Sequence, residues 1–347
     1  MTIAAAHRAG VPPFRASSYA RWDAHNYISI ATRGYYVEIE GGRVVGGNVA
    51  WFPGYALLVR AVASRHLTPA KAGLILSALF ALLVLALSWA ALATLPGVRS
   101  PVLALGLAAL FPGFVYHHAV FPISMVTALV LLSVMLAARG RYLAAGCCGA
   151  LAAATYSTGF LVAAPLLLAV ATDPQLDRRG RILAAVQAPF LVGAGVLAVL
   201  LYQGTTVGWD AFPRMQSEYF GNRPSNPLST LAWNTAYVWR GQLRWEYLPQ
   251  VQTLLVALLM WAAAARYAAR RGECTTLDTL LMAAAAVFWV FPMIVGRGVS
   301  PSRAESLLVL IVPLLARLPA GVQAVLLLVF AALGAAMGAL FFGGSLV

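Results

Sequence analysis

The chain contains several apolar runs of about twenty residues with almost no charge inside them, and this feature limits its fold more than any other. A run of this length is long enough to cross a bilayer as a helix. The helix is required because the bilayer core offers no water, so the backbone polar groups must pair with one another. The composition agrees: 61% of the residues are hydrophobic, 10% are charged and the mean hydropathy is +0.80, whereas soluble domains carry about 25% charged residues. The sequence therefore predicts an all-α, polytopic transmembrane helical bundle.

The apolar runs divide the chain into roughly eight to ten helical segments. The expected spans are Ala72–Leu95, Val102–Val120, Ile123–Ala138, Ile182–Tyr202, Val251–Ala269, Leu277–Val295, Glu305–Ala316 and Val322–Phe342. A further run, Tyr142–Ala171, is split at Tyr156-Ser157-Thr158-Gly159 into two half-helices. Residues Arg21–Asn48 are too polar to span and predict an external loop or a surface helix. Trp51–Arg65 predicts an interfacial helix with a snorkelling arginine.

These segments predict one membrane domain over residues 1–347. Residues 1–70 form the external first loop with its juxtamembrane helices, and residues 71–203 form the core helices. Residues 204–250 form a large external loop, and residues 251–347 form the C-terminal helices.

The net charge is +13, and every one of the 24 basic residues except Lys71 is arginine. The arginines are scattered between apolar helices instead of being gathered in a polar domain. This distribution favours membrane lipids and a lipid phosphate as partners, and no nucleic acid. Cys147, Cys148 and Cys274 lack the spacing of a metal site, so we expect no metal and no cofactor.

Arginines of the short turns predict the orientation, because basic residues concentrate in short cytoplasmic loops. The arginines at alternate turns are Arg99, Arg139, Arg141, Arg178, Arg179, Arg181, Arg266, Arg270 and Arg271. The expectation is a multi-pass protein of the plasma (inner) membrane with its active site outside. Seven of the eleven acidic residues then lie outside: Asp23, Glu38, Glu40, Asp210, Glu218, Glu246 and Glu305.

Asp23 is the sharpest candidate for chemistry, within Tyr19-Ala-Arg21-Trp22-Asp23-Ala-His25-Asn26-Tyr27. A carboxylate between an arginine and aromatic rings could accept a proton from a sugar hydroxyl while the arginine holds a phosphate. An interfacial aromatic belt with an ordinary arginine–aspartate pair is the alternative.

The segment RWDAHNYISIATRGY, followed by WFPGYALLVRAVA, resembles the first external loop of the PIG-V-like mannosyltransferases. This family belongs to the GT-C class of polytopic glycosyltransferases. HHAVFPISMVTALVLL is similar to its Pro-x-Ser turn and the helix that follows. RGRYLAAGCCGALAAATYSTGFLVAAPLLL looks like its half-helix pair, and PSRAESLLVLIVPLLARLP resembles its late Ser/Arg-rich turn.

The resemblance implies a GT-C-like fold and the transfer of a sugar, usually mannose, from a polyprenyl-phosphate carrier to an acceptor hydroxyl. The acceptor would be a lipid or a protein-linked glycan. Asp23 would be the catalytic base of an inverting displacement, and Arg21, Arg60 or Arg303 would bind the donor phosphate. Substrate contacts are expected from Trp22, His25, Tyr27, His117, His118 and Tyr156.

Three features depart from the family pattern. A transmembrane helix is expected before Arg-Trp-Asp, where residues 1–20 are weakly apolar. Met125 replaces an acidic residue after Pro-x-Ser, and Ala304 and Glu305 follow Arg303 in place of a late Arg-Tyr pair.

Several alternatives stay open on the sequence. The histidines stand near a helix end where water reaches them, and the Tyr156–Gly159 break could be a packing feature. The loop Gln203–Gln250 carries nine aromatic residues and could hold an acceptor or form an interfacial belt. The rival functions are a lipid-binding or transport protein, and an inactive family member that acts as a partner subunit.

Overall fold

The computed structural model describes residues 2–240, 247–295 and 301–345. The chain is mostly helical, as predicted, and five helices are long and apolar enough to cross a membrane. These five are α5 (Pro69–Thr94), α11 (Arg178–Val207), α14 (Leu248–Ala269), α15 (Thr276–Val295) and α18 (Ala320–Gly343). Their number is smaller than the number of predicted spans. Glu246 and residues 296–300 of the predicted outer turn lie outside the described residues.

Shorter apolar helices complete the bundle. They are α8 (Ile123–Ala137), α9 (Tyr142–Thr155) and the pair η1 (Gly159–Val162) and α10 (Ala163–Thr172). The predicted break at Tyr156–Gly159 is confirmed, since α9 ends at Thr155 and the chain turns back at residues 156–158. A side chain at Gly159 would come within 2.0 Å of the Ala152 carbonyl oxygen, so this turn requires glycine.

Two expected spans are wrong as continuous helices. Val102–Val120 breaks into α6 (Pro101–Ala109) and α7 (Val115–His118), because Pro112 lacks an N–H and Gly113 has a φ of +82°. Glu305–Ala316 is interrupted as well, and comprises the end of α16 (Pro301–Glu305), η5 (Ser306–Ile311) and α17 (Val312–Leu315). The two breaks meet, since a Cβ atom on Gly113 would lie 2.8 Å from Ser306 Cβ.

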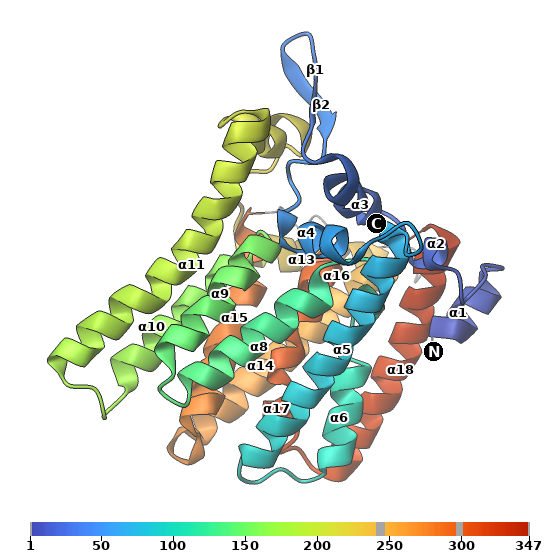
Figure 1. The fold of residues 1–347 in the computed structure, drawn as a ribbon. Coiled ribbons are helices and arrows are strands. Elements are labelled where there is room, and N and C mark those ends of the chain that lie inside the picture. The colour runs from blue at the N-terminus through green and yellow to red at the C-terminus, as the bar shows by residue number, and fades with distance from the viewer. Residues whose placement is uncertain (1, 241–246, 296–300, 346–347) are drawn as a thin grey trace.

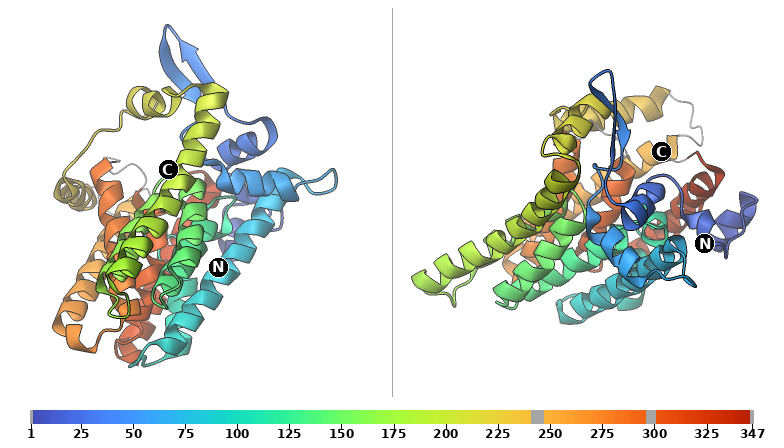
Figure 2. Two further views of the ribbon diagram at one scale, coloured as in Figure 1. Left: turned by 60° about the vertical axis from the view of Figure 1, so that its left-hand side comes forward. Right: turned by 45° about the horizontal axis from the view of Figure 1, so that its top comes forward.

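The first loop contains an unpredicted β-hairpin. Strands β1 (Val37–Glu40) and β2 (Arg43–Gly47) pair antiparallel, with Glu40 opposite Arg43 and a bulge between Glu38 and Ile39. Gly41 and Gly42 form the turn, and both have positive φ. The hairpin stands beyond the helices at one end of the molecule (Figures 1 and 2).

The rest of the first loop is helical. It contains α1 (Thr2–Arg8), α2 (Ala16–Tyr19), α3 (Ala24–Arg33) and α4 (Pro53–Val62). Tyr55 of α4 is buried, and its hydroxyl lies 2.8 Å from the Gly73 carbonyl oxygen and 2.9 Å from Ser77 Oγ of α5. Helices α3 and α4 pack together near the hairpin (Figure 1), and α4 packs against α5.

The large loop after α11 is also partly helical, with α12 (Ala211–Arg214), the π-helix η2 (Met215–Tyr219) and α13 (Pro227–Arg240). Glu218 of η2 accepts a 2.7 Å hydrogen bond from Val44 N, and Arg214 donates to the Gly42 carbonyl oxygen at 2.6 Å. These bonds join the hairpin to the region that follows α11. Arg244 and Trp245 of this loop lie outside the described residues.

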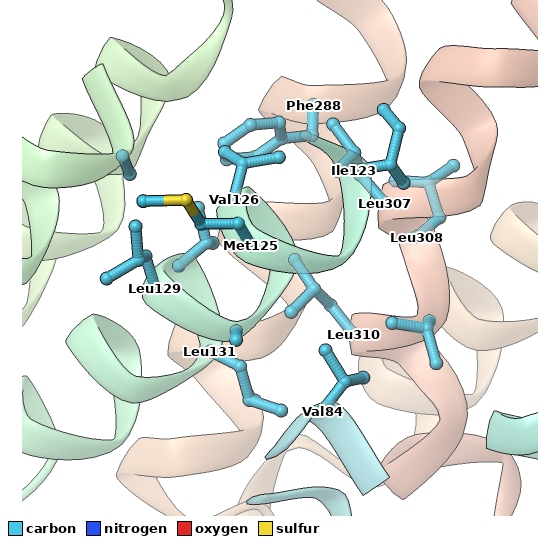
Figure 3. Packing of buried hydrophobic residues seen from close by; sticks show 14 of the residues in the cluster. Val84, Ile123, Met125, Val126, Leu129, Leu131, Phe288, Leu307, Leu308 and Leu310 are labelled. Carbon is cyan, nitrogen blue, oxygen red and sulfur yellow. The ribbon is translucent and has the colours of Figure 1, made fainter. Parts of the chain in front are cut away.

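The apolar core lies between α5, α8, α15 and η5. Figure 3 shows Val84, Val126, Phe288 and Leu310 packed together in it, and each is at most 3% exposed. Met125 is 8% exposed and belongs to the same cluster. The position at which the family resemblance expects an acidic residue is therefore part of the core.

Candidate functional site

Asp23 stands at the N-terminus of α3 and does not cap that helix. Aspartate is among the residues preferred at this position because its carboxylate accepts backbone N–H groups of the first turn. Here the Asp23 side chain makes no such bond. Its carboxylate is therefore available for another partner.

That partner is Arg303, which lies 280 positions later in α16. Arg303 Nη1 donates to Asp23 Oδ2 in an ion pair whose side chains are 22% exposed for Asp23 and 18% for Arg303. The guanidinium also lies over two rings, with Cζ 5.8 Å from the centroid of Tyr116 and 5.4 Å from that of Phe121. Aromatic faces attract a cation at these distances. The rings of Tyr116 and Phe121 thus hold the Arg303 guanidinium on one side, while both charged side chains stay partly exposed.

Two tyrosines complete the surroundings of the pair. Tyr27 of α3 packs edge-on against Phe121 at 6.4 Å, and Tyr156 follows α9. Both phenols lie close enough to interact electrostatically with Asp23 and Arg303. Burial raises the pKa of both hydroxyls above the ordinary value of tyrosine. Each therefore keeps its proton at neutral pH and can donate a hydrogen bond to a sugar oxygen or a phosphate.

Polar atoms beside the pair are buried without a partner among the described residues. They include Arg303 Nε, Trp22 Nε1 and Ser302 Oγ. Buried donors and acceptors are rarely left unpaired in proteins, and those that are mark ligand or water positions. Arg303 Nη1 donates to Asp23, and the Nε–H group of Arg303 therefore stays available for a ligand.

The backbone is strained directly before Asp23. Trp22 has a φ of +55°, and it is the single non-glycine residue with positive φ in the described parts of the chain. For a bulky residue this conformation is an outlier, and such strain concentrates at functional sites. The conformation of Trp22 directs the chain so that Asp23 begins α3 beside Arg303.

A second acid lies near the pair. Glu305 ends α16, is 4% exposed, and accepts a 3.1 Å hydrogen bond from Gln252 Nε2 of α14. The same amide nitrogen donates to the Ser302 carbonyl oxygen at 2.7 Å. Burial raises the pKa of Glu305 to about 7, because it disfavours the charged carboxylate. Glu305 forms no ion pair with another described residue that would offset this effect.

The other two predicted phosphate-binding arginines bond to backbone carbonyl groups and are not ion-pair partners of Asp23 among the described residues. Arg21 is half-buried, and its Nε donates to the Ser18 carbonyl oxygen at 3.3 Å. Arg60 donates to the carbonyl oxygens of Ala31 at 2.5 Å and Ile30 at 3.2 Å. It thus satisfies the C-terminal end of α3, about 15 Å from the end that carries Asp23 by the rise of an α-helix.

The predicted histidines do not touch the pair. His25 is exposed on α3. His117 is buried and its Nε2 lies 3.1 Å from the Ser306 carbonyl oxygen. His118 packs edge-on against Phe114, with the ring centroids 5.9 Å apart. Among the described residues, no group of three or more His, Cys, Asp or Glu side chains is placed to hold a metal ion.

Sequence reasoning missed Tyr116 and Phe121 as the rings beneath Arg303. Both flank His117 and His118 in Tyr116-His-His-Ala-Val-Phe121, and only the histidines were predicted as substrate contacts. An aromatic residue on each side of a helix break was the available signal. The ring pairing itself depends on the fold, with centroids 5.9 Å apart.

No protein family, no curated protein and no solved structure matches this chain in searches of the three kinds.

Proposed function

We propose that the protein is a membrane glycosyltransferase with a GT-C-like fold, which moves a sugar from a polyprenyl-phosphate carrier to an acceptor hydroxyl. The observation that supports this function most is the Asp23–Arg303 pair. It has a carboxylate not used for capping, a guanidinium whose Nε has no partner within the described part of the chain, and aromatic walls. The family resemblance favours mannose as the sugar.

The proposed reaction is an inverting displacement. The acceptor oxygen attacks the anomeric carbon while Asp23 takes the hydroxyl proton. The bond between the anomeric carbon and the phosphate oxygen breaks, and polyprenyl phosphate leaves with the electron pair. Arg303 binds the phosphate, whose negative charge increases as it leaves. Arg303 neutralises Asp23 in the free protein, and donor phosphate competes for the guanidinium and thereby frees the carboxylate for the acceptor.

An apolar groove offers a place for the isoprenoid chain. It has a volume of about 350 Å³ and begins at Phe160, just after the Tyr156 turn. It continues along α11 past Pro189, Gly193 and Leu200. An apolar groove of this kind suits the isoprenoid chain of a lipid-linked donor.

The charge distribution supports an outward-facing site. The turns after α5, α8, α10 and α14 lie at the end of the bundle opposite Asp23 and carry Arg99, Arg139, Arg141, Arg178, Arg179, Arg181, Arg270 and Arg271. Basic short turns face the cytoplasm. On this basis we place the protein in the plasma (inner) membrane with the Asp23 site outside.

A second candidate is a lipid-carrier-binding subunit without catalysis. It is favoured by Met125, which is buried in the apolar core where the resemblance expects a carboxylate (Figure 3). Binding of a polyprenyl phosphate without sugar transfer distinguishes this candidate from the enzyme.

The test is transfer of radiolabelled mannose from polyprenyl-phosphate mannose to lipid and glycan acceptors by the purified full chain. Asp23→Asn is expected to lower transfer by at least about a hundredfold, because it removes the base. Asp210→Asn is the matched control, since Asp210 is 70% exposed near the same end, and should leave transfer unchanged. Wild-type transfer by Asp23→Asn would refute the mechanism. Carrier binding with no transfer by any variant would support the subunit.

A further inference from the structure

A cavity of about 500 Å³ opens at the end of the bundle opposite Asp23. It lies between the α5–α6 turn, the end of α14 and α17, which come together at the lower end of Figure 1. Four arginines line it: Arg99, Arg266, Arg270 and Arg317. We call this cavity the arginine pocket. It is separate from the Asp23 site and shares no residue with it.

The four arginines differ in how far their donors are already used. Arg317 binds both oxygens of Asp278 at 2.8 Å and the Pro96 carbonyl oxygen at 2.8 Å. Arg270 pairs with the exposed Glu273 at 3.1 Å. Arg266 donates from one nitrogen only, to the Arg317 carbonyl oxygen at 3.2 Å. The Arg99 guanidinium has no acceptor among the described residues.

The charges of the pocket do not balance. Glu273 is the single acid in its lining, and Asp278 lies behind Arg317, so four arginines face two carboxylates. Arg317 and Asp278 compensate each other, whereas Arg99 and Arg266 form no ion pair with an acid in the described parts of the chain. An excess of two positive charges in a cavity selects an anion, and guanidinium groups match phosphate geometry in particular.

We propose that the arginine pocket binds a phosphate ester, held by the guanidinium groups of Arg99 and Arg266. The volume lies within the range of small-ligand sites. Val98, Ala263 and Leu314 provide apolar walls for the carbon part of the ligand. Both an anionic lipid headgroup and a soluble phosphate ester have this chemistry. The proposal does not depend on the glycosyltransferase reaction.

Binding is measured on the purified full chain in detergent, from the increase of Tm with ligand concentration. Phosphatidic acid in mixed micelles and soluble glycerol 3-phosphate are the two probes, and phosphatidylcholine micelles are the lipid control. Arg99→Gln is expected to weaken binding about tenfold, the effect of one lost charge-assisted hydrogen bond. Arg266→Gln should have a similar effect. Because Arg99 is exposed, its replacement leaves the fold intact.

Arg179→Gln is the matched control, because Arg179 is an exposed arginine at the same end and outside the pocket. Binding that Arg99→Gln weakens and Arg179→Gln does not supports the pocket. If only phosphatidic acid binds in this way, the ligand is a lipid headgroup; if glycerol 3-phosphate binds equally, it is a soluble ester. Equal weakening by Arg179→Gln, or no difference between phosphatidic acid and phosphatidylcholine together with no effect of glycerol 3-phosphate, overturns the proposal.

Discussion

Two arginine–aspartate pairs join distant parts of the described chain, one at each end of the bundle. Asp278 is fully buried, and its oxygens accept two bonds from Arg317 and two from the N–H and hydroxyl of Thr275, all at 2.8 Å. The pair of Asp23 and Arg303 is partly exposed and makes a single contact between its charged groups. The same two residue types thus make several hydrogen bonds at one end and a single one between them at the other.

This difference separates a structural link from a candidate binding site. Asp278 accepts four hydrogen bonds, and the Arg317 guanidinium donates both to Asp278 and to the Pro96 carbonyl oxygen, so both groups are held by several bonds. The Asp278–Arg317 pair fixes the loops of its end of the bundle. Arg303 Nε has no partner among the described residues, and the guanidinium lies over two aromatic rings, so the proposed donor phosphate would compete with Asp23 for it. The Asp23–Arg303 pair is the functional candidate because hydrogen-bonding groups of both side chains remain without a partner among the described residues.

The largest expected effect concerns Asp278→Asn. Removal of the negative charge leaves Arg317 uncompensated, and loss of one partner from a buried pair costs about 3–5 kcal/mol. We expect a clear fall in Tm, with transfer per folded molecule unchanged, measured by thermal unfolding and the mannose assay. Glu273→Gln, in an exposed pair, is the control and should leave Tm unchanged. A stable Asp278→Asn protein with impaired transfer would break the comparison.

Glu305 provides a further test of the comparison. Like Asp278 it is buried, but its partner is the Gln252 amide instead of an arginine. Burial raises its pKa from 4.5 to about 7, so the folded protein holds a proton that the unfolded chain releases. Stability is therefore expected to fall as pH rises from about 4.5 to about 7, by ~3 kcal/mol, and to stay level above. Glu305→Gln should remove this decrease when Tm is measured between pH 5 and pH 8. An unchanged pH dependence in the variant would contradict the assignment to Glu305.

Arg303→Lys should have a smaller effect, on transfer rather than on stability. Lysine keeps the charge but lacks the planar guanidinium fork that binds a phosphate through two N–H groups. We expect about 30-fold slower transfer, or ~2 kcal/mol, with Tm close to the wild-type value. A matched Arg60→Lys variant should transfer at the wild-type rate, because Arg60 binds the far end of α3. Equal losses in both variants would mean that position 303 has no special role.

Much of the bundle could be predicted from apolar runs alone. Helices α5, α14, α15 and α18 begin and end within a few residues of their expected bounds, because uncharged runs of this length have one stable form in a bilayer. The break near Pro112 was missed, since hydropathy alone does not reveal where a proline and a glycine interrupt a helix. The hairpin was missed although Val37-Glu-Ile-Glu40 alternates and is followed by Gly-Gly.

The site was predictable one residue at a time but not as an arrangement. Asp23 and Arg303 were both named from their motifs, and the fold brings them together across 280 positions. The local partner Arg21 was equally plausible on the sequence, yet its Nε bonds to Ser18. Which arginine meets the carboxylate is decided by the packing of α16 against the first loop. Single-sequence patterns hold no information on that packing.

Helix α11 is 30 residues long and so measures about 45 Å, whereas a bilayer core is about 30 Å thick. A spanning α11 that is not strongly tilted extends beyond the hydrocarbon and carries η2, and with it the hairpin, into the headgroup layer or the water above. The apolar groove lies along the same helix. A water-borne acceptor and a lipid-borne donor would then arrive from different directions, one from above past the hairpin and one sideways within the leaflet, and neither would have to leave before the other entered.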